Sequence, residues 1–61
     1  MNVGIAVDNW KLPTFRKNLE EAGFQYTETP APDRITLMKV ETDHVALIKE
    51  VIEESQRECS Q

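Results

Sequence analysis

The chain contains a single tryptophan, Trp10, in a short polar segment where a strand-like pattern changes to a helix-like one. An exposed tryptophan at this point would be a recognition anchor, because tryptophans often dominate the binding energy of protein interfaces. A buried one would pack on Pro30 and Pro32 and close the end of a small core, which is the more common outcome. Both interpretations place Trp10 beside the two prolines, and the anchor at Trp10, Pro30 and Pro32 is one hypothesis for protein interaction.

No catalytic set is visible among the nucleophiles and titratable side chains. A reactive cysteine needs a nearby cation or a helix N-terminus, whereas Cys59 follows Glu58 near the end of a predicted helix. His44, the only histidine, adjoins Asp43 at the start of the same helix, so it falls at the opposite end of the domain from Cys59. The sequence has no metal-ligand spacing and no glycine-rich phosphate loop. We therefore expect a protein that is not an enzyme, with no catalytic residue, no metal site and no cofactor.

Acidic residues follow one face of the last predicted helix. Glu50, Glu54 and Glu58 recur at every fourth position and form a row of like charges, which costs a little stability. Such a row could bind a basic partner or imitate the charge of a nucleic acid, although an acidic helix face is more often simply solvated. Glu50, Glu54 and Glu58 are therefore a second hypothesis for protein interaction.

Length and charge exclude several classes of protein. A chain of 61 residues forms one domain at most, and its core is marginal. A lone cysteine cannot add a disulfide, so self-association or a partner is the remaining common support. The net charge of −4 argues against binding to nucleic acid. The sequence shows neither a signal-peptide pattern nor a long apolar run, and we expect a cytoplasmic protein without membrane contact.

Three segments have the alternation or the β-branched and aromatic residues of strands. They are residues 2–8, 24–29 and 33–41. We expect Pro30 and Pro32 to end the pairing of the second strand. The third strand is apolar on both faces, which carry Ile35 and Leu37 on one side and Thr36, Met38 and Val40 on the other. A strand of this kind is usually central, and the sequence does not decide which of its faces meets the helices.

Two segments have helical periodicity. Pro13 places the start of the first helix near residues 10–12, and Gly23 stops it after residue 22. Its expected buried stripe is Leu12, Phe15, Leu19 and Ala22. The stripe of the second helix is Val45, Leu47, Ile48, Val51 and Ile52, continued by Ser55 and Cys59. The expected helix caps are Asp8 or Asn9 for the first helix and Thr42 or Asp43 for the second.

The element order is therefore β-α-β-β-α, an α+β fold. The handedness of βαβ connections favours a split βαβ unit, in which the third strand inserts between the first two to give the order 1-3-2, with both helices on one face. This pattern resembles the broad ferredoxin-like and ACT-like class in element order, without the last strand of that class. The resemblance concerns the fold and implies little about function.

The missing strand would leave the edge at residues 2–8 open, and an open edge invites pairing by another chain. The helix-free face of the sheet would also leave apolar side chains uncovered in either register of the third strand. We therefore expect a small interaction or regulatory module that forms a homodimer, through this face or through the first strand, or that binds another protein. Its size and charge also suit an accessory protein of a phage or mobile element that inhibits a host factor. The alternative is an ACT-like sensor that binds a small ligand near Asp8, Asn9 and Trp10.

Overall fold

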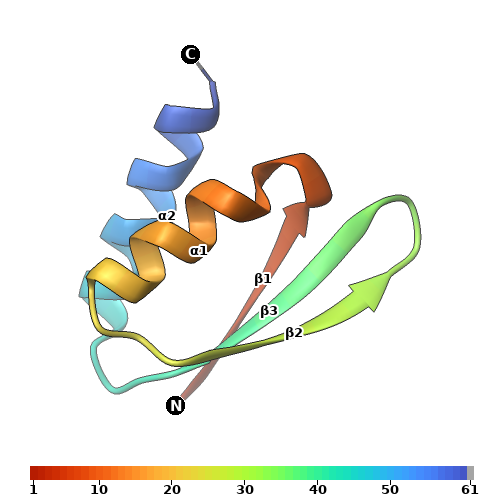
Figure 1. Ribbon diagram of the computed structural model, residues 1–61. Helices are drawn as coiled ribbons and strands as arrows, with labels where there is room; N and C mark the ends of the chain where they lie inside the picture. The colour runs from red at the N-terminus through yellow and green to blue at the C-terminus, as the bar shows by residue number, and fades with distance from the viewer. Residues whose placement is uncertain (61) are drawn as a thin grey trace.

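A computed structural model describes residues 1–60 as three strands and two helices with a short 3-10 turn (Figure 1). The elements are β1 (Asn2–Asp8), η1 (Asn9–Lys11), α1 (Leu12–Glu21), β2 (Tyr26–Ala31), β3 (Ile35–Glu41) and α2 (Val45–Cys59). The sheet has the order β1-β3-β2, and β3 is antiparallel to both neighbours. The two helices pack together on one face of this sheet. The predicted split βαβ fold is confirmed.

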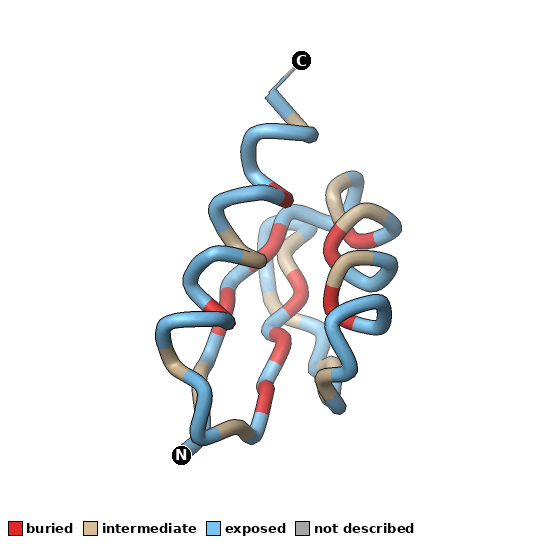
Figure 2. Tube along the Cα trace, turned by 90° about the vertical axis from the view of Figure 1, so that its left-hand side faces the viewer, coloured by how far each residue is buried: buried red, intermediate tan, exposed pale blue. Residues whose placement is uncertain are grey.

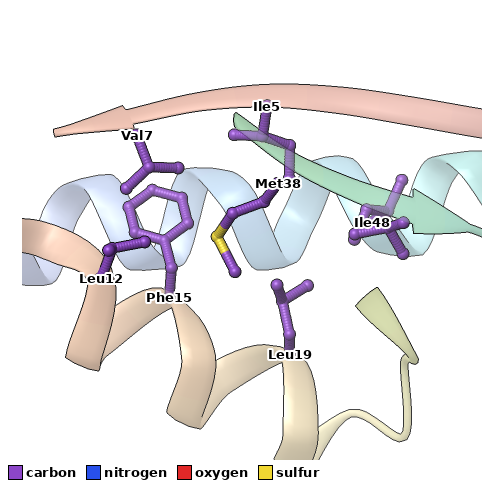
Figure 3. Packing of buried hydrophobic residues seen from close by; sticks show 8 residues of the cluster. Ile5, Val7, Leu12, Phe15, Leu19, Met38 and Ile48 are labelled. Carbon is purple, nitrogen blue, oxygen red and sulfur yellow. The ribbon is translucent and has the colours of Figure 1, made fainter. Parts of the chain in front are cut away.

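The face of β3 that meets the helices carries Thr36, Met38 and Val40, all of which are buried. Ile35 and Leu37 point to the other face, away from the two helices. Buried and exposed positions alternate along the strands accordingly (Figure 2). The register agrees with this, because Met38 and Thr36 lie opposite Ile5 and Val7, the buried residues of β1. Both helices contribute to the core, whose members are Ile5, Val7, Leu12, Phe15, Leu19, Met38, Val40 and Ile48 (Figure 3).

The first helix begins and ends largely as its sequence indicates. Pro13 stands in its first turn, and Gly23 ends it with φ of +82°. The Gly23 N–H donates to Glu20 O at 3.0 Å and the Phe24 N–H to Leu19 O at 2.9 Å, the two bonds of a Schellman motif. Ala22 was expected in the buried stripe, but it lies at the C-cap, where the chain leaves the helix, and is exposed.

Helix capping differs from the expectation. Neither Asp8 nor any other side chain caps η1 or α1, and α2 also begins without a side-chain cap. The Asn9 side chain instead accepts a hydrogen bond from Thr36 on β3. The Thr42 hydroxyl accepts from the His44 N–H at 2.9 Å, which fixes the turn just before α2 rather than the helix itself.

Two further expectations about the elements were wrong. The second strand runs from Tyr26 through Pro30 to Ala31, so the prolines do not end its pairing with β3. A proline is tolerated there because β2 is an edge strand. Leu47 was expected in the buried stripe of α2, but it is 43% exposed because it faces the groove between the helices.

Candidate functional site

Trp10 lies in η1, at the end of the molecule where β1 meets the turn between β2 and β3. It is 67% exposed, so it does not close the core. The Lys11 Nζ lies 5.2 Å from the centroid of its ring, within the range of a cation–π contact. Pro30 and Pro32 are also exposed. The structure therefore leaves the indole available at the surface.

A hollow of about 480 Å³ lies beside this tryptophan. Its lining residues are Asp8, Asn9, Trp10, Asp33 and Arg34. The Asn9 N–H donates to Arg34 O at 2.9 Å, and the Thr36 hydroxyl donates to Asn9 Oδ1 at 2.6 Å, so η1 is tied to the β2–β3 turn. The sequence indicated the first three of these residues and missed the last two. They were missed because residues 33–41 were all expected in the third strand, whereas β3 begins at Ile35 and Asp33 and Arg34 belong to the turn before it.

Asp33 and Arg34 adopt left-handed backbone conformations, with φ of +63° and +60°. This region costs about 1 kcal/mol or more for each residue that is not glycine. The two residues complete a three-residue loop between Ala31 and Ile35, which are paired across the hairpin. The strain therefore lies in the wall of the hollow beside Trp10.

The outer edge of β1 is free in the described part of the chain. On its inner side, Met1 O accepts from the Thr42 N–H and the Asn9 N–H donates to Arg34 O, each at 2.9 Å. Backbone groups of an antiparallel strand alternate between its two sides. The odd-numbered residues therefore bond to β3, and the groups that point outward belong to Asn2, Gly4, Ala6 and Asp8.

The outer edge of β2 is different. The same alternation turns the backbone groups of Tyr26, Glu28 and Pro30 outward. Pro30 has no N–H, and Glu28 adds a charged side chain, so this edge is poorly suited to further pairing. The β1 edge has no proline and no charged residue before Asp8. Only one of the two edges therefore carries the features that oppose strand addition.

The uncovered face of the sheet is mixed in polarity. Leu37 on this face is 48% exposed and lies between Ala6 on β1 and Thr29 on β2. A hollow of about 400 Å³ at the lower end of the face has polar lining residues for the most part, namely Asn2, Gln25, Tyr26, Thr27, Lys39 and Glu41. Exposed apolar surface and polar side chains therefore both occur on this face.

The acidic residues of α2 are all exposed, but they do not share one environment. Glu58 accepts a hydrogen bond from Asn18 on α1 at 3.1 Å. Glu54 forms an ion pair with Arg57 at 2.7 Å and also lines a groove between the helices, as does Glu50. The predicted row therefore faces the junction of the two helices.

His44 and Cys59 lie at opposite ends of α2, because His44 precedes its first residue and Cys59 is its last. His44 is exposed, and Cys59 packs partly against the core. Within residues 1–60, no group of three or more acidic, histidine or cysteine side chains is arranged to hold a metal ion. Neither of the described helices has the length and hydropathy needed to cross a membrane.

The residues with shifted pKa values are neighbours on α1 and β2, namely Arg16, Tyr26 and Glu28. Arg16 on α1 donates to Glu28 on β2, which raises the pKa of Arg16 and lowers that of Glu28. The pKa of Tyr26 is raised, first by burial and then by the charges of Glu20 and Glu28. This cluster joins α1 to β2 and has a structural explanation.

No protein-family model, no curated protein sequence and no solved structure matches this chain at a significant level.

Proposed function

We propose that the chain is a small, non-enzymatic interaction module that pairs with a second copy of itself through the β1 edge. The observation that supports this most directly is the contrast between the two sheet edges. Pro30 and Glu28 oppose strand addition at β2, whereas β1 presents a neutral, regular edge. A lone cysteine in a small acidic chain suits an intracellular module of this kind.

The register of such a pair follows from the alternation of backbone groups. An antiparallel pair related by a two-fold axis through Ile5 places Gly4 of one copy opposite Ala6 of the other, and Val3 opposite Val7. The outward-pointing groups then meet, because Gly4 and Ala6 are both even-numbered. The helices of both copies lie on the same side of a continuous six-stranded sheet. The second β1 occupies the place of the strand that follows α2 in ferredoxin-like folds.

The test is the solution mass by light scattering on a sizing column over a wide range of concentrations. We expect a dimer for the unchanged chain and a monomer for Ala6→Pro, which removes an outward N–H as Pro30 does on the other edge. Ala6→Lys is a second variant that leaves the backbone intact and places a charge beside the new pairing.

Thr29→Lys is the matched control, since Thr29 shares the row of Ala6 and Leu37 on the uncovered face but lies on β2. It should remain a dimer. Loss of the dimer in both lysine variants would indicate pairing through the sheet face and would contradict the edge proposal. A persistent monomer of the unchanged chain would contradict self-association altogether.

A second candidate function is the recognition of a small ligand in the hollow beside Trp10. It is favoured by one observation, namely that Asp8, Asn9 and Trp10 line a single hollow with Asp33 and Arg34. Titration with amino acids and nucleotides should then quench or shift the fluorescence of Trp10, the only tryptophan. Arg34→Ala should weaken a real response, whereas an unchanged response in that variant or no response would reject the candidate.

A further inference from the structure

A groove of about 340 Å³ runs between α1 and α2 on the helical side of the molecule. Its apolar lining residues are Ala22, Leu47 and Val51, which form what we call its floor, and Asn18 adds a polar amide. Ala22 is exposed and Leu47 is 43% exposed, although a leucine at this helical position would normally be covered. The groove therefore offers an apolar contact that the chain itself does not use.

The rim of the groove is acidic. Glu21 lies on the α1 side, and Glu50 and Glu54 lie on the α2 side. Among residues 1–60, no lysine or arginine lines the groove. Glu54 is paired with Arg57, whereas Glu21 and Glu50 take part in no ion pair among residues 1–60. The charge that remains around the apolar floor is therefore negative.

The walls of the groove are helices, whose backbone groups already bond within each helix. Few backbone groups are therefore free along the groove, and an incoming segment must satisfy most of its own N–H and C=O groups. A helix does so, and an apolar helix face placed in a groove is a common mode of recognition. An extended peptide would instead need a free strand edge, such as β1.

We infer that this groove binds a basic amphipathic helix of another protein. Apolar side chains of that helix pack on Leu47 and Val51, and its lysines or arginines lie beside Glu21 and Glu50. A second copy of this chain does not supply such a helix, because α2 is acidic and α1 carries equal numbers of basic and acidic residues. The occupant is therefore a different protein of opposite charge.

The groove continues beyond the helices into a neighbouring hollow of about 510 Å³, which shares Ala22 and Leu47 with it. Phe24 and Gly23 line this second hollow, and Glu41 adds a further acid. A basic helix longer than the groove can thus extend over both. This surface is separate from the β1 edge, so the inference does not depend on self-association.

The experiment uses a labelled synthetic peptide of about 18 residues, or five helical turns, with leucines along one face and lysines on the others. Its binding is measured by fluorescence anisotropy at low salt and mapped by amide chemical shifts. We expect shifts at Ala22, Leu47 and Glu50. We also expect Leu47→Gln to weaken binding about tenfold, because a leucine contact buried on binding is lost.

Two control variants change residues outside the groove, one of the same type as Leu47 and one of the same type as Glu50. Leu37→Gln replaces the other strongly exposed leucine, which lies on the opposite face of the sheet. Glu53→Gln replaces an exposed glutamate of α2 that does not line the groove. Both should bind as the unchanged chain does, whereas Glu50→Gln should lose about threefold in affinity at low salt.

A peptide of the same composition with its leucines scrambled around the helix should bind at least tenfold more weakly. If the scrambled peptide binds equally well, the contact is general charge attraction, and the inference is overturned. Equal losses of affinity in Leu47→Gln and Leu37→Gln would overturn it for the same reason. Shifts centred on β1 or the uncovered sheet face would overturn it as well, as would the absence of binding. The solution mass of each variant, measured separately, reports on the β1 proposal alone.

Discussion

Arg16 and Glu28 form a two-pronged ion pair that joins α1 to β2. The Arg16 Nε and Nη2 atoms donate to the two carboxylate oxygens of Glu28, each at 2.7 Å. Glu28 is only about a quarter exposed, with a relative side-chain accessibility of 25%. No backbone hydrogen bond of the sheet joins α1 to β2. The ion pair therefore fixes the position of α1 relative to the edge of the sheet.

The first prediction is that this pair makes stability depend on pH in acid. The hydrogen bond from Arg16 lowers the pKa of Glu28 in the folded state below its ordinary value of 4.5. The stabilisation is therefore fully present above pH 4.5 and is lost as the pH falls through the lowered folded pKa, because the unfolded chain takes up its proton first. Thermal unfolding followed by circular dichroism between pH 7 and pH 3 measures this loss.

Glu28→Gln removes the titrating group and should lower the unfolding temperature by a few degrees at neutral pH, with a smaller further fall in acid. Glu53→Gln, at an exposed position of α2, should keep the pH dependence of the unchanged chain. Parallel pH curves for the unchanged chain and Glu28→Gln would contradict the predicted pH dependence of the pair.

The second prediction concerns Thr36, which is 8% exposed and donates to Asn9 Oδ1 at 2.6 Å. Thr36→Val preserves the shape but removes the donor, and should lower the free energy of unfolding by about 1 kcal/mol. Because Asn9 precedes Trp10, the loss should also change the tryptophan emission of the folded state. Urea denaturation gives the first quantity and a fluorescence spectrum the second, and unchanged values of both would refute the role of this bond.

The third prediction concerns Ser55, the fully buried hydroxyl at the contact between the helices. It accepts from Asn18 Nδ2 at 2.9 Å and donates to Val51 O at 2.8 Å. Ser55→Ala removes both bonds and should cost about 1 kcal/mol of stability, measured by urea denaturation. Ser60→Ala is the control, because that hydroxyl bonds to the helix backbone in the same way but is exposed. A loss of equal size in the control would indicate a general effect of serine at the helix end.

Much of the fold could be predicted because local signals and the global topology agree in this chain. Pro13 and Gly23 mark the start and end of α1, and the alternation of residues 2–8 gives β1 its buried face. The richness of residues 33–41 in apolar side chains placed β3 in the middle of the sheet. These features depend on residue type and spacing alone.

The features that could not be predicted depend on which side of an element faces its neighbour. Both faces of β3 are apolar in part, so the sequence left open whether Met38 or Leu37 is buried. The same limit applies to Leu47, which belongs to the apolar stripe of α2 but faces a groove. Pro30 was expected to end the second strand, because a proline is tolerated in a strand only at an edge position where its nitrogen points outward.

The sequence predicted where the candidate surfaces lie, but it did not predict all of the residues that line them. The sequence placed Trp10 near the β2–β3 connection and the acidic row on α2, and both lie there. It missed Arg34 and Glu21, which come from other elements and meet these residues only in the folded chain. Partners separated by 24 residues or more in sequence leave no local periodic signal, so no pattern could have paired them.

The last prediction concerns the strained turn, in which Arg34 holds φ of +60° without being glycine. Arg34→Gly relieves the steric cost of that conformation and should raise the free energy of unfolding by about 0.5 kcal/mol, after the added freedom of the unfolded chain is subtracted. Arg34→Ala keeps the cost and serves as the control. Urea denaturation of the three proteins distinguishes them, and equal stability of the glycine and alanine variants would mean that the turn stores no strain. If the glycine variant is more stable, arginine stands at this position in spite of its conformational cost, which is the expected trade-off for a side chain in the wall of a binding hollow.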